Sequence, residues 1–174
     1  PFFIMQELQG FEASPQLITL PPYAEHAQKL ALQKWSILGE ISRADPTALG
    51  LDTVMESVAP EDCGEKELAY WESRIDRDET SPQPILRAAI RWLRRTPQPR
   101  AEKLSVVHGD YRTGNFLYDS EGTVQGILDW EMAHLGDPLE DLAWGLNPIW
   151  RFGGEARAGG LVPREEAIRI WERA

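Results

Sequence analysis

The first half of the chain carries apolar residues at intervals of three and four, the spacing that buries one face of an α-helix. Residues 23–42 follow this pattern, and Pro21 and Pro22 come just before it, where proline favours helix initiation. The predicted stripe of this core-facing helix comprises Ala27, Leu30, Ala31, Lys34, Trp35 and Leu38. Residues 44–63 lack periodicity and indicate a connecting loop.

The same spacing predicts two further helices, over residues 65–78 and 83–95. In the second of these, apolar residues are expected to face inward and arginines outward; the inward set is Ile85, Leu86, Ala89, Ile90 and Leu93. Trp35, Trp71 and Trp92 all fall on apolar helical faces, so we expect them to pack in a core rather than to form a stacking surface.

Short β segments and turns follow from residue 104. Strands are predicted over 104–107, 116–119 and 124–128, with a hairpin turn at 120–122. Helical patterns return over 138–146 and from residue 163 onward, whereas residues 151–160 form a glycine-rich loop without the spacing of a phosphate cradle. Near the N-terminus, Phe2–Met5 indicate a buried strand, and residues 6–10 indicate a turn that follows it and ends at Gly10. We therefore expect a mainly α fold with a small β-hairpin region, an α+β class.

Composition narrows the function classes. The chain has 174 residues, 42% of them hydrophobic, which is enough for one sizeable domain. Its net charge of −10 argues against a nucleic-acid-binding surface. No apolar run approaches the ~20 residues that cross a bilayer, so no membrane span is expected. Cys63 is the single cysteine and no disulfide can form within the chain, which is consistent with a cytoplasmic location. The three histidines are too scattered to indicate a zinc site.

Two motifs carry the candidate chemistry: HGDYRTGN at 108–115 and ILDWE at 127–131. A phosphoryl-transfer site needs one carboxylate at the acceptor hydroxyl and oxygen ligands for a metal that neutralises the nucleotide phosphates. Asp110, Asn115 and Asp129 match these roles in order, with Asp110 at the hydroxyl and the other two on the metal. Each of these residues alone is most simply explained as a turn or loop residue. Their order along the chain and their positions at strand ends together favour a phosphoryl-transfer site.

Neighbouring residues are given supporting roles. His108 precedes the loop and is expected to brace it through hydrogen bonds rather than to act as a base. Glu131 lies two positions after Asp129, close to the metal or at the surface. Two other classes of function remain open: a metal-dependent phosphohydrolase, which also gathers acidic residues around cations, and a non-catalytic pseudokinase or partner-binding domain.

The two motifs resemble those of the aminoglycoside phosphotransferase and choline kinase-like family, small-molecule relatives of the protein kinases. LGDPLEDLAW at 135–144 is similar to the family segment that follows, in which Asp141 would brace the catalytic loop. The forms HGDYRTGN and LDWE are most similar to the subfamily found alone or fused to acyl-CoA dehydrogenases. The resemblance implies transfer of the γ-phosphate of ATP, with Mg²⁺, to a hydroxyl of a small molecule, and it leaves the acceptor open.

The resemblance also implies which part of a kinase-like fold each segment of the chain would form. Residues 1–10 would be a hinge strand and linker, with the backbone of Gln6 and Leu8 facing the adenine ring. Residues 11–174 would be a kinase-like C-terminal lobe, incomplete at its C-terminus and without the N-terminal lobe and its phosphate-binding lysine. We therefore expect this chain to be a fragment with weak or no activity and weak Mg-ATP binding.

Overall fold

The computed structural model describes residues 8–96, 99–153 and 157–174. These residues divide into two compact units. The first unit contains the described residues of Pro1–Arg43 together with His108–Ala133 and Leu139–Ala174, and the second contains Ala44–Val107 and His134–Pro138. About half of the chain is helical and its sheets are small. No helix within the described ranges is long and apolar enough to cross a membrane.

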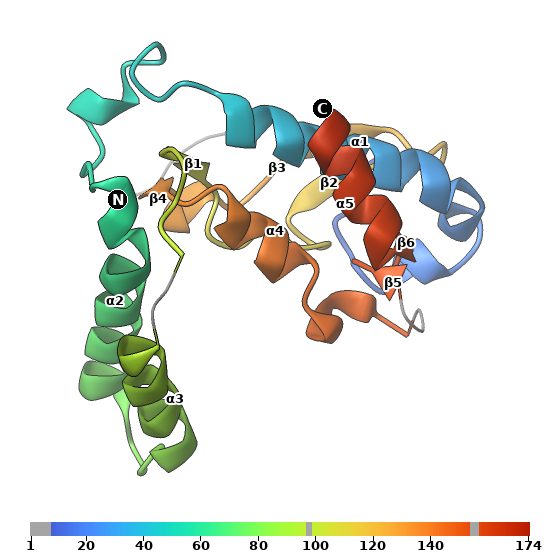
Figure 1. The fold of residues 1–174 in the computed structure, drawn as a ribbon. Coiled ribbons are helices and arrows are strands. Elements are labelled where there is room, and N and C mark those ends of the chain that lie inside the picture. The colour runs from blue at the N-terminus through green and yellow to red at the C-terminus, as the bar shows by residue number, and fades with distance from the viewer. Residues whose placement is uncertain (1–7, 97–98, 154–156) are drawn as a thin grey trace, which may run out of the picture. The chain divides into compact units, whose positions relative to one another are not determined.

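Helix α1 (Ala27–Arg43) is the centre of the first unit, and a 3-10 turn (Tyr23–His26) leads into it. The predicted stripe is confirmed, since Leu30, Trp35 and Leu38 are fully buried. Helix α5 (Arg164–Arg173) packs against α1 (Figure 1) and buries Ala167 and Ile170. Burial of these apolar side chains supplies most of the stabilisation of the unit.

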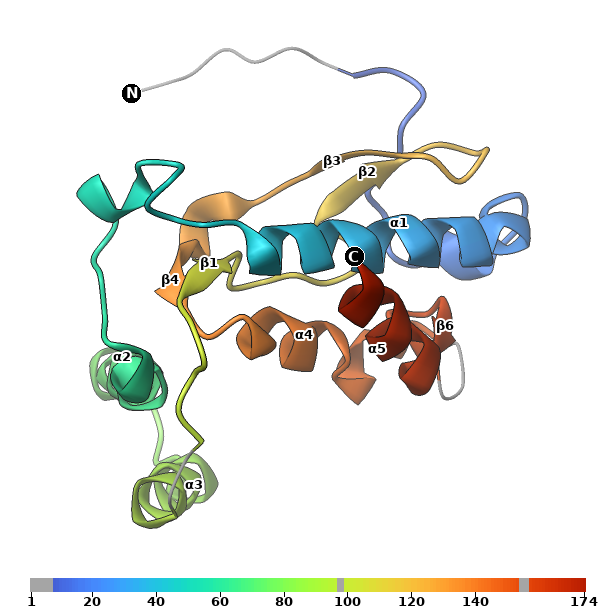
Figure 2. The same ribbon diagram turned by 45° about the horizontal axis from the view of Figure 1, so that its top comes forward.

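The predicted hairpin is confirmed and lies along α1. Strands β2 (Phe116–Tyr118) and β3 (Val124–Ile127) pair antiparallel, with Phe116 opposite Ile127. Gln33 of α1 fixes the turn, because its Nε2 donates to the Gly122 carbonyl (2.7 Å) and its Oε1 accepts from the Val124 N–H (3.0 Å). In Figure 2, α1 lies between this hairpin on one side and helices α4 (Leu139–Gly145) and α5 on the other.

The glycine-rich segment contains more structure than the sequence predicts. After α4, a 3-10 turn (Pro148–Arg151) leads toward a short antiparallel pair, β5 (Arg157–Ala158) and β6 (Val162–Pro163). Gly159 and Gly160 make the turn between them with φ of 61° and 80°. The glycines therefore serve a tight turn. Further 3-10 turns of this unit span Leu17–Thr19 and Trp130–Met132.

In the second unit, α2 (Cys63–Asp78) and α3 (Pro84–Arg95) form a helical hairpin. Two arginines of α3 join it to α2 through ion pairs. Arg87 pairs with Asp76 and Glu79, and Arg94 pairs with Glu65 and Glu72. These pairs lie at the surface, where each contributes little to stability. Two short 3-10 turns, Leu51–Thr53 and Pro60–Asp62, occur in the predicted loop before α2.

The packing predicted for α2 and α3 is wrong. Trp71 is 49% exposed and Trp92 63% exposed, and on α3 Ile85 is 82% exposed while Ile90 alone is buried. Periodicity identifies the face of a helix that can be buried, but not whether a partner covers it. Here Arg87 and Arg94, two of the arginines predicted to point outward, form ion pairs with residues of α2.

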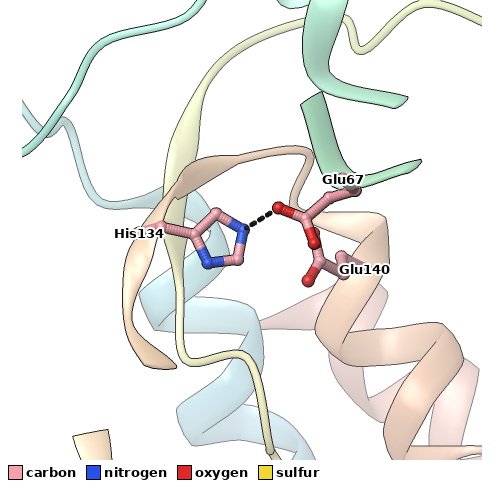
Figure 3. Close-up of side chains that lie close together, drawn as sticks. All are labelled: Glu67, His134 and Glu140. Carbon is pink, nitrogen blue, oxygen red and sulfur yellow. Dashed lines mark ion pairs between the residues drawn. The ribbon is translucent and has the colours of Figure 1, made fainter. Parts of the chain in front are cut away.

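Strand β1 (Ser105–Val107) is confirmed, and its partner β4 (His134–Gly136) is a strand that the sequence did not predict. They pair antiparallel with Val106 opposite Leu135. In the same unit, His134 Nε2 lies 3.3 Å from the Glu67 carboxylate, an ion pair when the imidazole is protonated (Figure 3). Of the predicted hinge, Phe2–Met5 and Gln6 lie outside the described residues, and Leu8 is 39% exposed.

Candidate active site

The loop 108–115 lies in the first unit, and one buried carboxylate of α4 accepts hydrogen bonds from its backbone. Asp141 Oδ2 accepts from the His108 N–H (2.6 Å) and Oδ1 accepts from the Gly109 N–H (3.0 Å). Asp141 is only 2% exposed. Burial raises the pKa of this carboxyl, and the two backbone hydrogen bonds oppose that rise. The loop backbone is thereby fixed at its start.

Gly109 is required by both backbone conformation and space. Its φ is +86°, a conformation that side chains rarely adopt, and a Cβ there would lie 2.8 Å from both Cβ and the carbonyl oxygen of Met132. The second atom belongs to the backbone and cannot move aside easily. The motif therefore needs glycine at this position.

His108 is fully buried, and both of its ring nitrogens are engaged. Nδ1 accepts from the Asp110 N–H (3.1 Å), and Nε2 lies 2.8 Å from the Leu128 carbonyl oxygen. Because Nδ1 is the acceptor, we assign the ring proton to Nε2, which donates to Leu128. The lone pair of Nδ1 is used inside the loop, so the geometry indicates bracing and not proton abstraction from a substrate.

Asn115 and Asp110 are joined through the Asn115 amide. Its Nδ2 donates to the Asp110 carbonyl oxygen (2.9 Å) and to Asp110 Oδ2 (2.8 Å). With both amide protons used, Asn115 Oδ1 accepts from none of the described residues and is open to a cation. The Asn115 carbonyl oxygen also accepts from the Leu128 N–H (2.7 Å), which brings the loop beside the end of β3.

Asp129 follows Leu128 in a left-handed conformation, with φ 66° and ψ 55°. A residue with a side chain adopts this conformation at a cost of roughly 1–2 kcal/mol, and such residues concentrate at functional sites. Its exposed carboxylate and the open Asn115 oxygen are the hard oxygen donors that Mg²⁺ prefers, so these residues fit a magnesium site. Glu131 is exposed on the 3-10 turn that begins after Asp129.

Two residues at the site were missed by sequence reasoning. Trp144 Nε1 donates to Asp110 Oδ1 (2.7 Å), and Arg112 Nε lies 3.0 Å from Asp110 Oδ2. The Arg112 guanidinium in turn lies 5.0 Å from the ring of Trp150. A signal was present for Trp144, because it stands three residues after Asp141 and a helix presents such positions on one face.

A buried amine lies behind the same loop. Lys34 of α1 is 0% exposed, and its Nζ lies 3.1 Å from Thr113 Oγ1, which itself donates to the Gly159 carbonyl (2.7 Å). Burial, aided by the positive charge of Arg112, lowers the pKa of Lys34 to about 7. Three aromatic rings lie 4.9–5.6 Å from Nζ, those of Trp35, Tyr111 and Phe116.

Tyr111 ties the loop to α1 a second time, because its hydroxyl donates to the Lys34 carbonyl oxygen (2.6 Å). Burial raises the pKa of this phenol above its usual range. Residues 111 and 113 therefore point into the core, while Asp110 and Arg112 are about one-fifth and one-quarter exposed. This alternation leaves the Asp110 carboxylate partly exposed beside the Asn115 amide.

Comparison with known proteins identifies the family of the chain. Residues 1–173 match the model of the phosphotransferase enzyme family (APH). The chain is 31% identical to mouse acyl-CoA dehydrogenase family member 10 over 83% of its length, and 28% identical to chicken acyl-CoA dehydrogenase family member 11 over 82%. It spans only 13% and 18% of the length of these two relatives.

Solved structures share the fold. A presumed aminoglycoside phosphotransferase from Ralstonia eutropha superposes with a TM-score of 0.68 at 23% identity, covering 89% of this chain and 50% of that one. A type I macrolide 2'-phosphotransferase superposes with a TM-score of 0.57 at 23% identity, covering 84% of this chain and 43% of that one. Since the family model matches almost the whole chain, the chain belongs to the phosphotransferase enzyme family.

Proposed function

We propose that the protein containing this chain transfers the γ-phosphate of ATP to a hydroxyl group of a small molecule. The observation that carries the proposal is the amide of Asn115, which binds Asp110 through its nitrogen and keeps its oxygen open. The Asn115 side chain would thereby connect the Asp110 carboxylate, which is proposed to bind the acceptor, to its own amide oxygen, which is proposed to bind the metal. Family membership supports the phosphotransferase class.

In this proposal Asp110 accepts the hydrogen bond of the acceptor hydroxyl and orients its oxygen for attack. Asn115 and Asp129 hold Mg²⁺, which when bound neutralises the charge that develops on the phosphates. His108 and Asp141 keep the loop in place, and Glu131 stays outside the metal ligands or contacts them through water. Leu8 would contribute its backbone to the nucleotide site.

The acceptor is proposed to be a hydroxylated metabolite, because the chain resembles a segment of acyl-CoA dehydrogenase family members 10 and 11. The test is a screen of hydroxylated metabolites for Mg-ATP consumption, performed on the full protein from which the chain derives. Asp110→Ala should abolish consumption, whereas Asp52→Ala, which removes an exposed carboxylate in the second unit, should not.

Three outcomes would count against the proposal. Consumption of ATP that survives Asp110→Ala would remove Asp110 from the reaction. Release of phosphate from a phosphoester without any need for ATP would favour a phosphohydrolase. A ligand that binds the native state raises its stability, so unchanged stability on addition of Mg-ATP would mean that Mg-ATP does not bind. Together with the absence of ATP consumption and of phosphoester hydrolysis, that result would favour a non-catalytic partner-binding domain.

A further inference from the structure

The carboxylate of Asp110 already accepts three hydrogen bonds from neighbouring side chains. A carboxylate offers about four acceptor positions, two on each oxygen. In the described structure Oδ2 accepts from Arg112 Nε (3.0 Å) and Asn115 Nδ2 (2.8 Å), and Oδ1 accepts from Trp144 Nε1 (2.7 Å). Oδ2 is therefore filled, and one position is left on Oδ1.

We propose that Trp144 and Arg112 are positioning residues that hold Asp110 in a single orientation, so that the acceptor hydroxyl donates to Oδ1 beside the Trp144 indole. This inference rests on the proposed function. Neither residue exchanges a proton or a phosphoryl group. Each acts by restricting rotation of the Asp110 carboxylate, because donors on both oxygens fix the carboxylate plane in a way that one donor cannot.

The two donors are themselves held in place by aromatic packing. The rings of Trp144 and Trp150 meet edge to face, with centroids 5.2 Å apart. The Arg112 guanidinium lies 5.0 Å from the Trp150 centroid, within the range of a cation–π contact. Trp150 thus contacts both donors, and a shift of either side chain would disturb its packing with the same ring.

Helix α4 adds a reason why Trp144 is suited to this role. Asp141 on the same helix accepts the N–H groups of His108 and Gly109, so α4 fixes the backbone just before Asp110 as well as its side chain. The distance between the Trp144 indole and the Asp110 carboxylate therefore depends on few flexible bonds. Positioning by rigid elements is more accurate than positioning by loops.

The first experiment is independent of the reaction. Indole N–H signals of the chain are recorded by ¹⁵N–¹H NMR for the wild type, Trp144→Phe and Asp110→Ala. The signal that disappears in Trp144→Phe should be the one that moves in Asp110→Ala, because its acceptor is gone. The Trp171 indole donates to Ser42 Oγ and should stay in place. An unmoved Trp144 signal would overturn the proposal; Asp110→Val, whose side chain also offers no acceptor, repeats the comparison if the alanine variant does not fold.

The second experiment measures Mg-ATP hydrolysis, with water as the acceptor, in the full protein. Trp144→Phe keeps the aromatic ring but removes the donor, and we expect kcat to fall roughly 10- to 100-fold while the KM for ATP is unchanged. Trp171→Phe is the matched control and should keep kcat. Arg112→Lys keeps the charge without the planar donor group and should retain more activity than Arg112→Met.

The outcomes distinguish failure of the positioning role from failure of the proposed function. Wild-type kcat in Trp144→Phe, or a raised KM for ATP at unchanged kcat, would refute the positioning role. Full activity in Asp110→Ala would instead refute the proposed function, while the NMR comparison would still decide whether Trp144 holds this carboxylate.

Discussion

The buried amine of Lys34 should make the stability of the protein depend on pH in a way that one substitution removes. Its ordinary pKa of 10.5 falls to about 7 in the folded chain. Between these values the unfolded chain binds a proton that the folded chain does not, so the free energy of unfolding rises with pH. Below pH 7 both states are protonated, and the full penalty of a buried charge applies.

The magnitude follows from the two pKa values. A difference of 10.5 − 7 corresponds to about 5 kcal/mol between pH 7 and pH 10.5 at about 1.4 kcal/mol per pKa unit. None of the ion pairs in the described part of the chain includes Lys34, and its bond to Thr113 and its aromatic neighbours only partly compensate the charge. We expect Lys34→Met, which keeps the length and apolar stem, to remove this pH dependence.

The assay is urea denaturation of the wild type and Lys34→Met at pH 6, 7.5, 9 and 10.5. The stability of the variant relative to the wild type should be greatest at pH 6 and should decrease by up to about 5 kcal/mol toward pH 10.5. Lys29→Met is the control, because Lys29 is an exposed lysine of the same helix. A difference between wild type and Lys34→Met that stays constant from pH 6 to 10.5 would refute the reasoning.

Three further substitutions test the loop and the proposed metal ligand Asp129. Asp141→Asn should lower stability by about 1–3 kcal/mol in urea, because an amide leaves one of two buried N–H groups unpaired; an unchanged midpoint would contradict this. Gly109→Ala should reduce the melting temperature more than Gly10→Ala, which has a similar φ of +81° but open space; equal losses would show that backbone strain alone matters. Asp129→Gly should keep or raise stability, by up to about 1 kcal/mol, while abolishing Mg²⁺-dependent ATP hydrolysis; a variant as unstable as Asp129→Ala would disprove the strain at this residue.

The parts of the fold that the sequence predicts are those specified by local pattern. The stripe on α1 repeats at helical spacing over several turns, and the hairpin has its turn residues between two short apolar strands. Strand β4 was missed because it has three residues and pairs with β1, which is distant in sequence. Such pairing is decided by tertiary contacts rather than by local propensity.

Some residues of the candidate site can likewise be predicted from the sequence, and others cannot. Asp110, Asn115 and Asp129 could be selected because their spacing and order are informative. Trp144 stands three residues after Asp141, but this spacing alone does not select it, since an aromatic residue on an amphipathic helix is most simply explained by core packing. The prediction that Lys34 lies on the buried stripe of α1 is confirmed, but the sequence does not reveal that its amine is surrounded by aromatic rings with no acidic partner among the described residues.

Helix α4 has a consequence for how substrate preference could change in this family. Seven residues supply the contacts to the loop backbone and to the Asp110 carboxylate, through Asp141 and Trp144. A movement of α4 as a rigid body would carry Asp141 and Trp144 together, so their contacts to the loop backbone and to the Asp110 carboxylate would keep the same mutual geometry. With Asp110 in the role proposed above, side chains elsewhere around the acceptor could vary without disturbing its carboxylate, so that chemistry and recognition would be free to change separately.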